Sequence, residues 1–367
     1  MLRDLSIKNY RCFEDFSIDG LARVNLLVGS NNSGKTSFLE AVALLAYQGS
    51  VSPLLDSLEN RGEIIEEFKA IKPEEKTQYQ STYFVQYLFN ENLSFDKKYI
   101  SIKATNTSSD SDALSLEIRM QPASPEDAEK YSISHEIMLS SRNYKTKIPV
   151  FNDGAIVPEF IDFHKQSSRI QERANYLFGG QNKIFFLTVN NVSYAHLSML
   201  WNYITLTPKE DIVVDALKII ESEVERINFT TKPTANSGIL IRLRGKHPTP
   251  LGSMGGGMRR ILTLVMAAVT VENGILLVDE IDTGLHHEVQ TQMWKMIVKI
   301  AQNLNIQVFA TTHSWDCICA FQEALEEAKD RSVGMLFRLD KKYGELRAVE
   351  YTSDDLDTAV HQSIEVR

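Results

Sequence analysis

The spacing of hydrophobic residues along residues 1–50 changes from the alternation typical of strands to the spacing typical of a helix. Leu5 and Ile7 alternate with polar neighbours, and Asp15–Ile18 has the pattern of a returning strand. An apolar strand over 23–28 runs into a glycine-bearing loop, and from Thr36 onward apolar residues recur at helical spacing. The N-terminal pattern therefore predicts strand, turn, strand, loop and helix in that order.

Residues 51–180 have a different pattern, with a charged stretch and short apolar segments in place of long regular elements. A charged stretch over 59–76 is followed by short strands, separated by polar breaks at 105–112 and 121–130 that we expect to be surface loops. The expected strands are Tyr99–Ala104, Ala113–Met120, Tyr131–Leu139 and Tyr144–Phe151. We interpret the segment as an inserted antiparallel β lobe that ends with a helix over Pro158–Phe178.

Residues 181–330 are more regular. Thr207, Pro208 and Glu210 combine a capping residue, a first-turn proline and an acid, which predicts the start of a helix. We expect that helix to bury one apolar stripe, made of Val213, Leu217, Ile220, Val224 and Ile227. The further elements expected in this part are a helix from Arg259, a strand over Ile275–Val278, a helix over about 288–304 and a strand over Gln307–Thr311.

Residues 331–367 predict a closing hairpin, Val333–Leu339 and Leu346–Tyr351 around a turn at 343–344, and then a short helix. Strands that alternate with amphipathic helices indicate an α/β fold. We therefore expect a single unit over 1–367, with a mostly parallel core sheet, helices on both of its faces and the antiparallel β lobe.

Composition narrows the class of protein. With 43% hydrophobic and 24% charged residues, the chain is an ordinary globular protein and not a fibrous, disordered or disulfide-built one. The net charge of −9 argues against a surface coated for nucleic acid, although Arg259, Arg260 and Lys183 could form a local basic face. The three cysteines form no bridge framework, there is no export signal, and the apolar run 261–271 is too short for a membrane. We expect a cytoplasmic protein.

Residues 29–36, Gly-Ser-Asn-Asn-Ser-Gly-Lys-Thr, fit the phosphate-loop pattern G-x-x-x-x-G-K-[ST]. Glycines let successive N–H groups turn inward, Lys35 can reach the β- and γ-phosphates, and the Thr36 hydroxyl suits Mg²⁺. A glycine-bearing turn could match by chance, but the strand before it and the helix after it are the context the motif requires. The expected nucleotide-binding residues are Gly29, Asn31, Asn32, Ser33, Gly34, Lys35, Thr36 and Ser37.

Two later strands end in polar residues. The apolar strand before Asp279 and Glu280 would place these carboxylates at the ligand edge of a parallel sheet, Asp279 for the Mg²⁺ shell and Glu280 to deprotonate the attacking water. His313 follows the next strand and can donate to a γ-phosphate. The plainer interpretations are an acidic turn and a structural histidine. We expect the adjacent His286 and His287 to point apart and assign no metal to them.

A second glycine-rich loop, residues 251–260, directly precedes an apolar helix. Ser253, Gly255 and Gly257 offer a hydroxyl and bare backbone N–H groups at a helix N-terminus, which suits a second phosphate-facing loop better than a flexible linker. One chain with one ATP hardly needs two such loops. Two chains facing each other would each close the site of the other.

Taken in order, these motifs, with the Asp-Thr-Gly-Leu-His turn at 282–286, resemble an ABC-type ATPase head of the RecF/SMC-like and overcoming-lysogenisation-defect (OLD) type "AAA family" ATPases. The resemblance implies ATP and Mg²⁺ as ligands, Lys35 and Thr36 as the Walker A pair, Asp279 as the Walker B acid, Glu280 as catalytic base and His313 as the switch histidine. It further implies that Ser253, Gly255 and Gly257 act across a dimer, that Asp282 belongs to the D-loop, and that Arg11 lies near the nucleotide.

Departures from those relatives limit the expectation. The chain lacks the long heptad arms of SMC-like proteins, and too few residues follow His313 for the Toprim nuclease of OLD proteins. No Q-loop glutamine can be assigned among Gln78, Gln80 and Gln86. In related bacterial systems the ATPase works with a separately encoded effector, often a Toprim-like nuclease or another toxin, in anti-phage defence.

Three functions are consistent with the sequence. The first is an ATP-hydrolysing switch that dimerises around two nucleotides and controls such an effector. The second is a RecF-like DNA-repair or DNA-clamping ATPase, for which salt-dependent DNA binding stimulated by ATP would be the discriminating observation. The third is a scaffold that binds nucleotide without hydrolysing it, against which the presence of Lys35, Asp279 and Glu280 argues.

Overall fold

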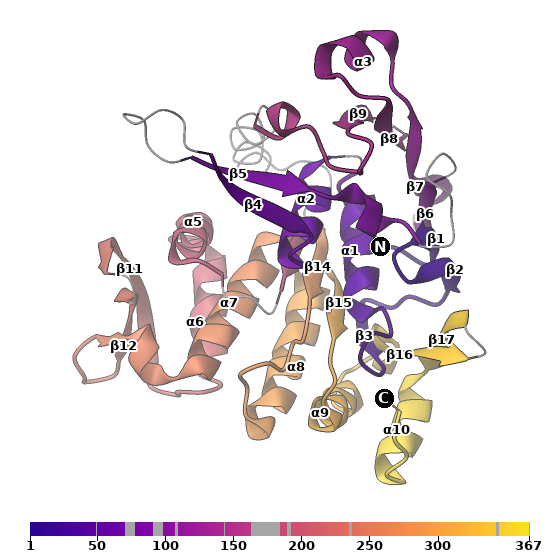
Figure 1. Ribbon diagram of the computed structural model, residues 1–367. Coiled ribbons are helices and arrows are strands. Elements are labelled where there is room, and N and C mark those ends of the chain that lie inside the picture. The colour runs from indigo at the N-terminus through magenta and orange to yellow at the C-terminus, as the bar shows by residue number, and fades with distance from the viewer. Residues whose placement is uncertain are drawn as a thin grey trace.

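A computed structural model describes residues 1–48, 50–69, 78–90, 98–106, 109–142, 144–162, 184–188, 192–234, 237–342 and 345–366. Its centre is a six-stranded sheet. The strands follow the order β10 (Ile184–Leu187), β14 (Ile275–Val278), β15 (Gln307–Thr311), β3 (Val24–Val28), β16 (Gly334–Lys342) and β17 (Glu345–Tyr351). Neighbours from β10 to β16 are parallel, and β17 returns antiparallel to β16. The expected mostly parallel core sheet is confirmed (Figure 1).

Side chains of the central strands alternate between two hydrophobic cores, one on each face of the sheet. In β3, Leu26 enters one core and Leu27 the other, and in β15 Ala310 and Phe309 divide in the same way. This period of two follows from strand geometry. Because both faces are buried, β14 (Ile-Leu-Leu-Val) is apolar at every position and does not alternate.

Helices cover both faces. The first core is closed by α5 (Tyr194–Ile204), α6 (Pro208–Leu217), α7 (Gly256–Thr270), α8 (His287–Asn303), α9 (Trp315–Glu326) and α10 (Ser353–His361). The second core lies against α1 (Lys35–Ala46) and α2 (Ser52–Asn60). The structure thus has the helices-on-both-faces arrangement that the alternating pattern predicts (Figure 1).

An antiparallel sheet shares the second core with α1. Its strand order is β2 (Phe13–Ile18), β1 (Leu5–Tyr10), β6 (Tyr99–Asn106), β7 (Ser109–Pro122), β8 (His135–Ser141) and β9 (Lys145–Val150). The antiparallel meander predicted for the middle of the chain is present. The N-terminal hairpin belongs to the same sheet, because β1 pairs with β6. The local sequence pattern does not predict this pairing.

Several local expectations in the middle of the chain are wrong. The polar break at 105–112 is mostly strand, since β6 and β7 extend into it from both sides. The break at 121–130 contains α3 (Pro125–Tyr131), which Ser124 caps by accepting from the Asp127 N–H. A serine cap and a first-turn proline are a helix signal that the composition of the segment masked. Tyr131 therefore ends a helix and does not begin β8.

The helix from Pro208 is shorter than predicted. It ends at Leu217, and Val224 and Ile227 belong to β11 (Val224–Thr234), which pairs with β12 (Ser237–Leu243) and through it with β13 (Thr249–Pro250). Val224 and Ile227 are both buried although they lie three positions apart, because the register of β11 shifts between Val224 and Arg226, and this spacing resembled a helical stripe. A further hairpin pairs β4 (Ile64–Lys69), inside the charged stretch 59–76, with β5 (Gln78–Tyr83), just beyond it.

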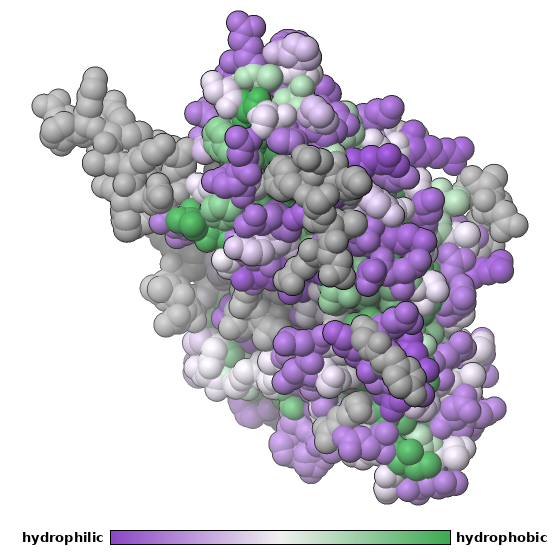
Figure 2. Space-filling model, turned by 45° about the vertical axis from the view of Figure 1, so that its right-hand side comes forward, coloured by the Kyte–Doolittle hydropathy of each residue, from purple (hydrophilic) through white to green (hydrophobic). Residues whose placement is uncertain are grey.

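Other features complete the fold. Short 3₁₀ turns are η1 (Val85–Leu88), η3 (Leu251–Met254) and η4 (Arg331–Val333). The turn expected at 343–344 and all but the first residues of the helix expected over Pro158–Phe178 lie outside the described residues. None of the helices in the described ranges combines the length and hydropathy that a bilayer crossing requires. The face in Figure 2 is mainly hydrophilic, with only scattered apolar side chains.

Candidate nucleotide site

The phosphate loop connects β3 to α1 and needs glycine at two positions. Gly29 has φ 144°, and a Cβ there would lie 2.5 Å from the Leu339 carbonyl oxygen. Gly34 has φ 90°, and a Cβ there would lie 2.8 Å from Cys12 Sγ. Since L side chains avoid these torsions and the space is filled, only glycine allows the loop to lie against its neighbours and enter α1. The N-terminus of α1 is thereby presented to an anion.

Lys35 is buried and bonds to the loop itself. Its ammonium donates to the carbonyls of Gly29 and Ser30, both at 2.9 Å, and to Ser33 Oγ at 3.4 Å. Burial lowers the pKa of Lys35 to about 8, while the nearby Asp279 and Glu280 act in the opposite direction. The charge is therefore held poorly solvated at the place where an incoming phosphate would stabilise it.

Oxygen donors meet at the end of β14. Asp279 Oδ2 accepts from Thr36 Oγ1 at 2.9 Å, and its Oδ1 accepts from Thr311 Oγ1 at 2.6 Å. A hydroxyl and a carboxylate in direct contact are a donor set that fits Mg²⁺, which prefers oxygen ligands. Thr311, at the end of β15, is a residue that motif reasoning missed. It acts on the acid only because β14 and β15 are parallel neighbours.

Glu280 has a left-handed backbone, with φ 46°. Its N–H donates to Thr311 Oγ1 at 2.8 Å, and its carboxylate Oε2 accepts from Thr283 Oγ1 at 3.0 Å. The Arg260 guanidinium also donates to the carbonyls of Asp279 and Glu280, at 3.1 and 2.7 Å. The expectation that Arg260 belongs to a surface basic face is therefore wrong, and Lys183 lies outside the described residues. These contacts hold Glu280, a non-glycine residue, in a sparsely populated backbone conformation at the candidate nucleotide site.

An open cavity of about 630 Å³ gathers most of the predicted site. Its walls include Arg11, Asn31, Asn32, Ser33, Gly34, Lys35, Thr36, Ser37, Asp279, Glu280 and His313. Burial, and then the positive charge of Lys35, lower the pKa of His313 below its usual value. The lowered pKa favours the neutral imidazole at the cavity wall, a form that can donate one hydrogen bond.

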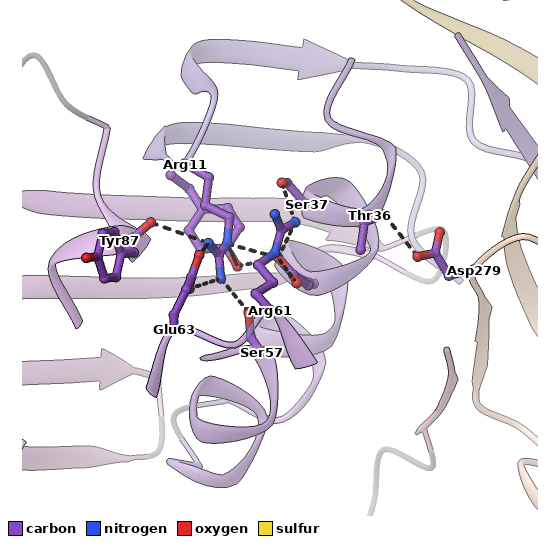
Figure 3. A network of polar contacts seen from close by, with 10 residues as sticks. Arg11, Thr36, Ser37, Ser57, Arg61, Glu63, Tyr87 and Asp279 are labelled. Carbon is purple, nitrogen blue, oxygen red and sulfur yellow. Dashed lines mark hydrogen bonds and ion pairs between the residues drawn. The ribbon is translucent and has the colours of Figure 1, made fainter. Parts of the chain in front are cut away.

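Arg11 lines the cavity but is committed to other partners. It bonds Glu63 through both terminal nitrogens, at 2.7 and 3.0 Å, and its Nε lies 3.0 Å from Glu40 Oε2. Arg61, which the sequence did not single out, lies on the same wall and donates to Ser37 Oγ at 2.9 Å (Figure 3). Of the glutamine candidates, Gln86 lines a neighbouring cavity with Arg11, and the side chains of Gln78 and Gln80 lie outside the described residues.

The second glycine-rich loop does not reach this cavity in the same chain. Ser253, Gly255 and Gly257 are absent from its walls, and Ser253 and Gly255 are exposed. The helix α7 begins at Gly256, one turn earlier than predicted. A Cβ on Gly257 would lie 3.4 Å from the Gly284 carbonyl, so the start of α7 packs beside the turn that contains Asp282. Asp282 Oδ1 in turn accepts from Thr312 Oγ1 at 2.6 Å, next to His313.

His286 and His287 do not point apart as predicted. Their ring centroids lie 4.2 Å from each other, because His286 is the extended N-cap residue of α8. Both rings are exposed, as is the neighbouring Glu288. The assumption that adjacent residues diverge holds within a helix and fails at its first residue.

The family described as "AAA domain, putative AbiEii toxin, Type IV TA system" matches residues 24–316, most of the chain. The chain belongs to this AAA domain family. The match runs from β3 through the phosphate loop and Asp279 to just beyond His313, so it includes every wall of the cavity except Arg11 and its neighbour Cys12.

The chain is also similar in sequence to curated proteins. An "ATP/GTP phosphatase" of Helicobacter pylori is 23% identical over 352 residues, which is 89% of each chain. "DNA replication and repair protein RecF" of Streptococcus agalactiae is 39% identical over 49 residues, 13% of each chain.

Solved structures show the fold. An SMC head bound to the C-winged helix domain of ScpA has a TM-score of 0.54 at 13% identity and covers 96% of this chain and 97% of that chain. An SMC head with an extended coiled coil, bound to the C-terminal domain of ScpA derived from Pyrococcus furiosus, has a TM-score of 0.52 at 11% identity, with 99% of each chain covered. The protein is an ATPase with an SMC-like, ABC-type head, and its described residues include no coiled-coil arm.

Proposed function

We propose that this ATPase is a molecular switch that dimerises around two ATP molecules and controls a separately encoded effector, a Toprim-like nuclease or another toxin, in bacterial anti-phage defence. The observation that carries the proposal is the separation of two phosphate-binding features within one chain. The cavity holds Lys35 and Asp279, while the Ser253–Gly257 loop faces solvent outside it.

Within one chain, the cavity residues divide the work. Lys35 leaves the loop carbonyls and pairs with the β- and γ-phosphates, and the first N–H groups of α1 bind the same oxygens. Thr36 and Asp279 would hold Mg²⁺, which supplies charge neutralisation at the phosphates when bound. Glu280 accepts a proton from the attacking water, and the Thr283 hydroxyl orients its carboxylate. His313 donates to the γ-phosphate.

The second chain completes the site. In the ATP-bound dimer, the Ser253 hydroxyl and the N-terminus of α7 from one chain face the γ-phosphate held by its mate. Asp282 links the two sites, because it bonds Thr312 beside His313 while its turn packs against Gly257. ATP bridges the chains and favours the closed dimer, and hydrolysis removes the bridge.

Two observations favour different uses of that switch. The family description contains the words "putative AbiEii toxin, Type IV TA system", which support a role in defence. The RecF similarity supports a DNA-repair or DNA-clamping ATPase as the second candidate. ATP-stimulated binding to duplex DNA that weakens steeply with salt would favour the RecF-like role. Its absence at low salt would favour the effector switch.

The Glu280→Gln variant tests the switch. We expect it to bind ATP and Mg²⁺ and to accumulate as a dimer, because the step that dissolves the bridge is blocked. Light scattering during size-exclusion chromatography measures the mass, and phosphate release measures turnover. The matched control is Glu288→Gln, an exposed glutamate in the first turn of α8 that should behave as wild type. If the Glu280→Gln protein stays monomeric with ATP, the proposed ATP-dependent dimer is wrong.

A further inference from the structure

A compact cluster of charges lies beneath the wall of the nucleotide cavity. Two guanidinium groups, Arg11 and Arg61, share one buried carboxylate, Glu40 of α1. Arg11 also pairs with Glu63 (Figure 3). The Glu40 side chain is only 3% exposed. The nucleotide chemistry described above uses neither arginine, although both line the cavity.

Arg11 is fixed in this cluster. Its side chain is 6% exposed and bonds Glu63 twice, Ser57 Oγ at 2.9 Å and Glu40. If Arg11 turned to a phosphate, it would leave two largely buried carboxylates with one cation fewer, which is strongly unfavourable. Arg11 is therefore suited to holding α1, α2 and the start of β4 together, and not to following a ligand.

Arg61 differs in exposure and geometry. It follows the last turn of α2, and its side chain is 31% exposed at the cavity wall. Its Nε and Nη2 form a side-on pair with Glu40, at 2.8 and 3.1 Å. The same Nη2 also donates to Ser37 Oγ at 2.9 Å, so the outer edge of the guanidinium is directed toward the first turn of α1.

This arrangement allows Arg61 to take a phosphate without giving up Glu40. The outer edge exchanges the Ser37 hydroxyl for phosphate oxygens, while the side-on edge keeps the carboxylate. A planar guanidinium can bind two oxyanions along two of its edges, whereas an ammonium lacks this planar, paired donor geometry. Glu40 keeps bonds from Arg11 and from the Tyr10 hydroxyl, at 3.2 Å, in either state.

We propose that Arg61 is a phosphate-binding residue of the nucleotide site, that Glu40 positions it, and that Arg11 is the structural arginine of the cluster. The inference rests on the proposed role of this cavity in binding ATP. It assigns the second cation of the site, after Lys35, to a residue that lies in no nucleotide-binding motif.

The Arg61→Gln variant tests the assignment. We expect the Kd for ATP with Mg²⁺ to rise about 10- to 100-fold, the loss of a charge-assisted bidentate contact. Arg61→Lys should recover only part of the affinity, because lysine keeps the charge and loses the fork. The matched control is Arg331→Gln, an exposed arginine remote from the cavity, which should bind ATP as wild type does. Unchanged ATP affinity in folded Arg61→Gln protein would overturn the proposal.

A double variant separates a lost contact from a damaged cluster. Arg61→Gln with Glu40→Gln removes the Glu40 carboxylate together with the cation that Arg61 supplies to it. If Arg61 binds phosphate, the double variant stays weak; if Arg61 only neutralises Glu40, the double variant regains affinity and the proposal is wrong. Lys35→Ala separates the two proposals. If Lys35→Ala binds ATP weakly and Arg61→Gln binds it normally, only the proposed role of Arg61 is wrong. If Lys35→Ala binds ATP as wild type does, the cavity is not the ATP site.

Discussion

At the scale of single residues, the site is built from groups held in unfavourable states. Lys35 is a buried cation bonded to carbonyls and a hydroxyl of its own loop, and Glu280 has a backbone that non-glycine residues rarely adopt. Both states are maintained by specific neighbours and would be relieved or used when a nucleotide arrives. Such groups are common at functional positions.

The pKa of Lys35 predicts a pH dependence of binding. Because the free protein holds this ammonium with a pKa of about 8, half of it is deprotonated near that pH, and phosphates bind the charged form. We expect the Kd for ATP to be nearly constant below about pH 7, to be about doubled at about pH 8 and to rise above that by at most about tenfold per pH unit. Isothermal titration at several pH values measures this.

Lys35→Arg provides the control for that profile. Its guanidinium stays charged, so this variant should bind ATP more weakly than wild type but with a flat profile over the same range. A flat profile for the wild-type protein would show that Lys35 is not the group that meets the phosphates.

At the scale of elements, two neighbouring strand ends assemble the acidic centre. Asp279 directly follows β14 and Thr311 ends β15, and the parallel pairing of these strands places the hydroxyl between the Asp279 carboxylate and the Glu280 N–H. A local pattern predicts each strand, whereas the bond between their ends depends on the strand order in the sheet. The order is what turns two short motifs into one site.

Thr311→Val tests this coupling. Valine keeps the shape of threonine and removes the hydroxyl, which leaves the carboxylate oxygen and the Glu280 N–H without that partner. We expect the free energy of unfolding to fall by about 1–3 kcal/mol and a higher Mg²⁺ concentration to be needed for ATP turnover. Urea denaturation and a Mg²⁺ titration measure the two effects. Thr311→Ser, which keeps the hydroxyl, should restore the Mg²⁺ dependence, and failure to do so would contradict the assignment.

At the scale of the whole molecule, the features for binding phosphate lie on two surfaces. The loop with Lys35 lines the cavity, and the loop with Ser253 lies exposed at the start of α7. A symmetric dimer brings such surfaces together twice, so each site would contain residues of both chains. This arrangement makes a prediction that single variants cannot test and mixed dimers can.

Mixing two inactive variants should restore activity. Lys35→Ala and Ser253→Arg each disable both sites of a homodimer, but a mixed dimer contains one intact site. At a one-to-one ratio about half the dimers are mixed, so phosphate release should recover to about a quarter of the wild-type rate. Replacing Ser253→Arg by the double variant Lys35→Ala with Ser253→Arg should abolish recovery. No recovery in the first mixture would show that the loops do not act across a dimer.

The amino-acid sequence by itself determined the parts that depend on neighbours along the chain. The glycines around Lys35, the apolar strands Ile275–Val278 and Gln307–Thr311 and the acids after the first of them were all predicted at their observed positions. Torsion, turn chemistry and the burial of a strand on both faces are local requirements, so they leave a local trace.

Tertiary structure decided everything that joins distant segments. Thr36 meets Asp279 across 243 positions, Arg61 reaches Glu40 from another helix, and β1 pairs with β6. The errors at Val224 and Ile227 have the same origin, because a short apolar spacing fits a helix or a strand until its partner is known. Long-range pairing is selected by the packing of the whole core, and no window along the chain contains that information.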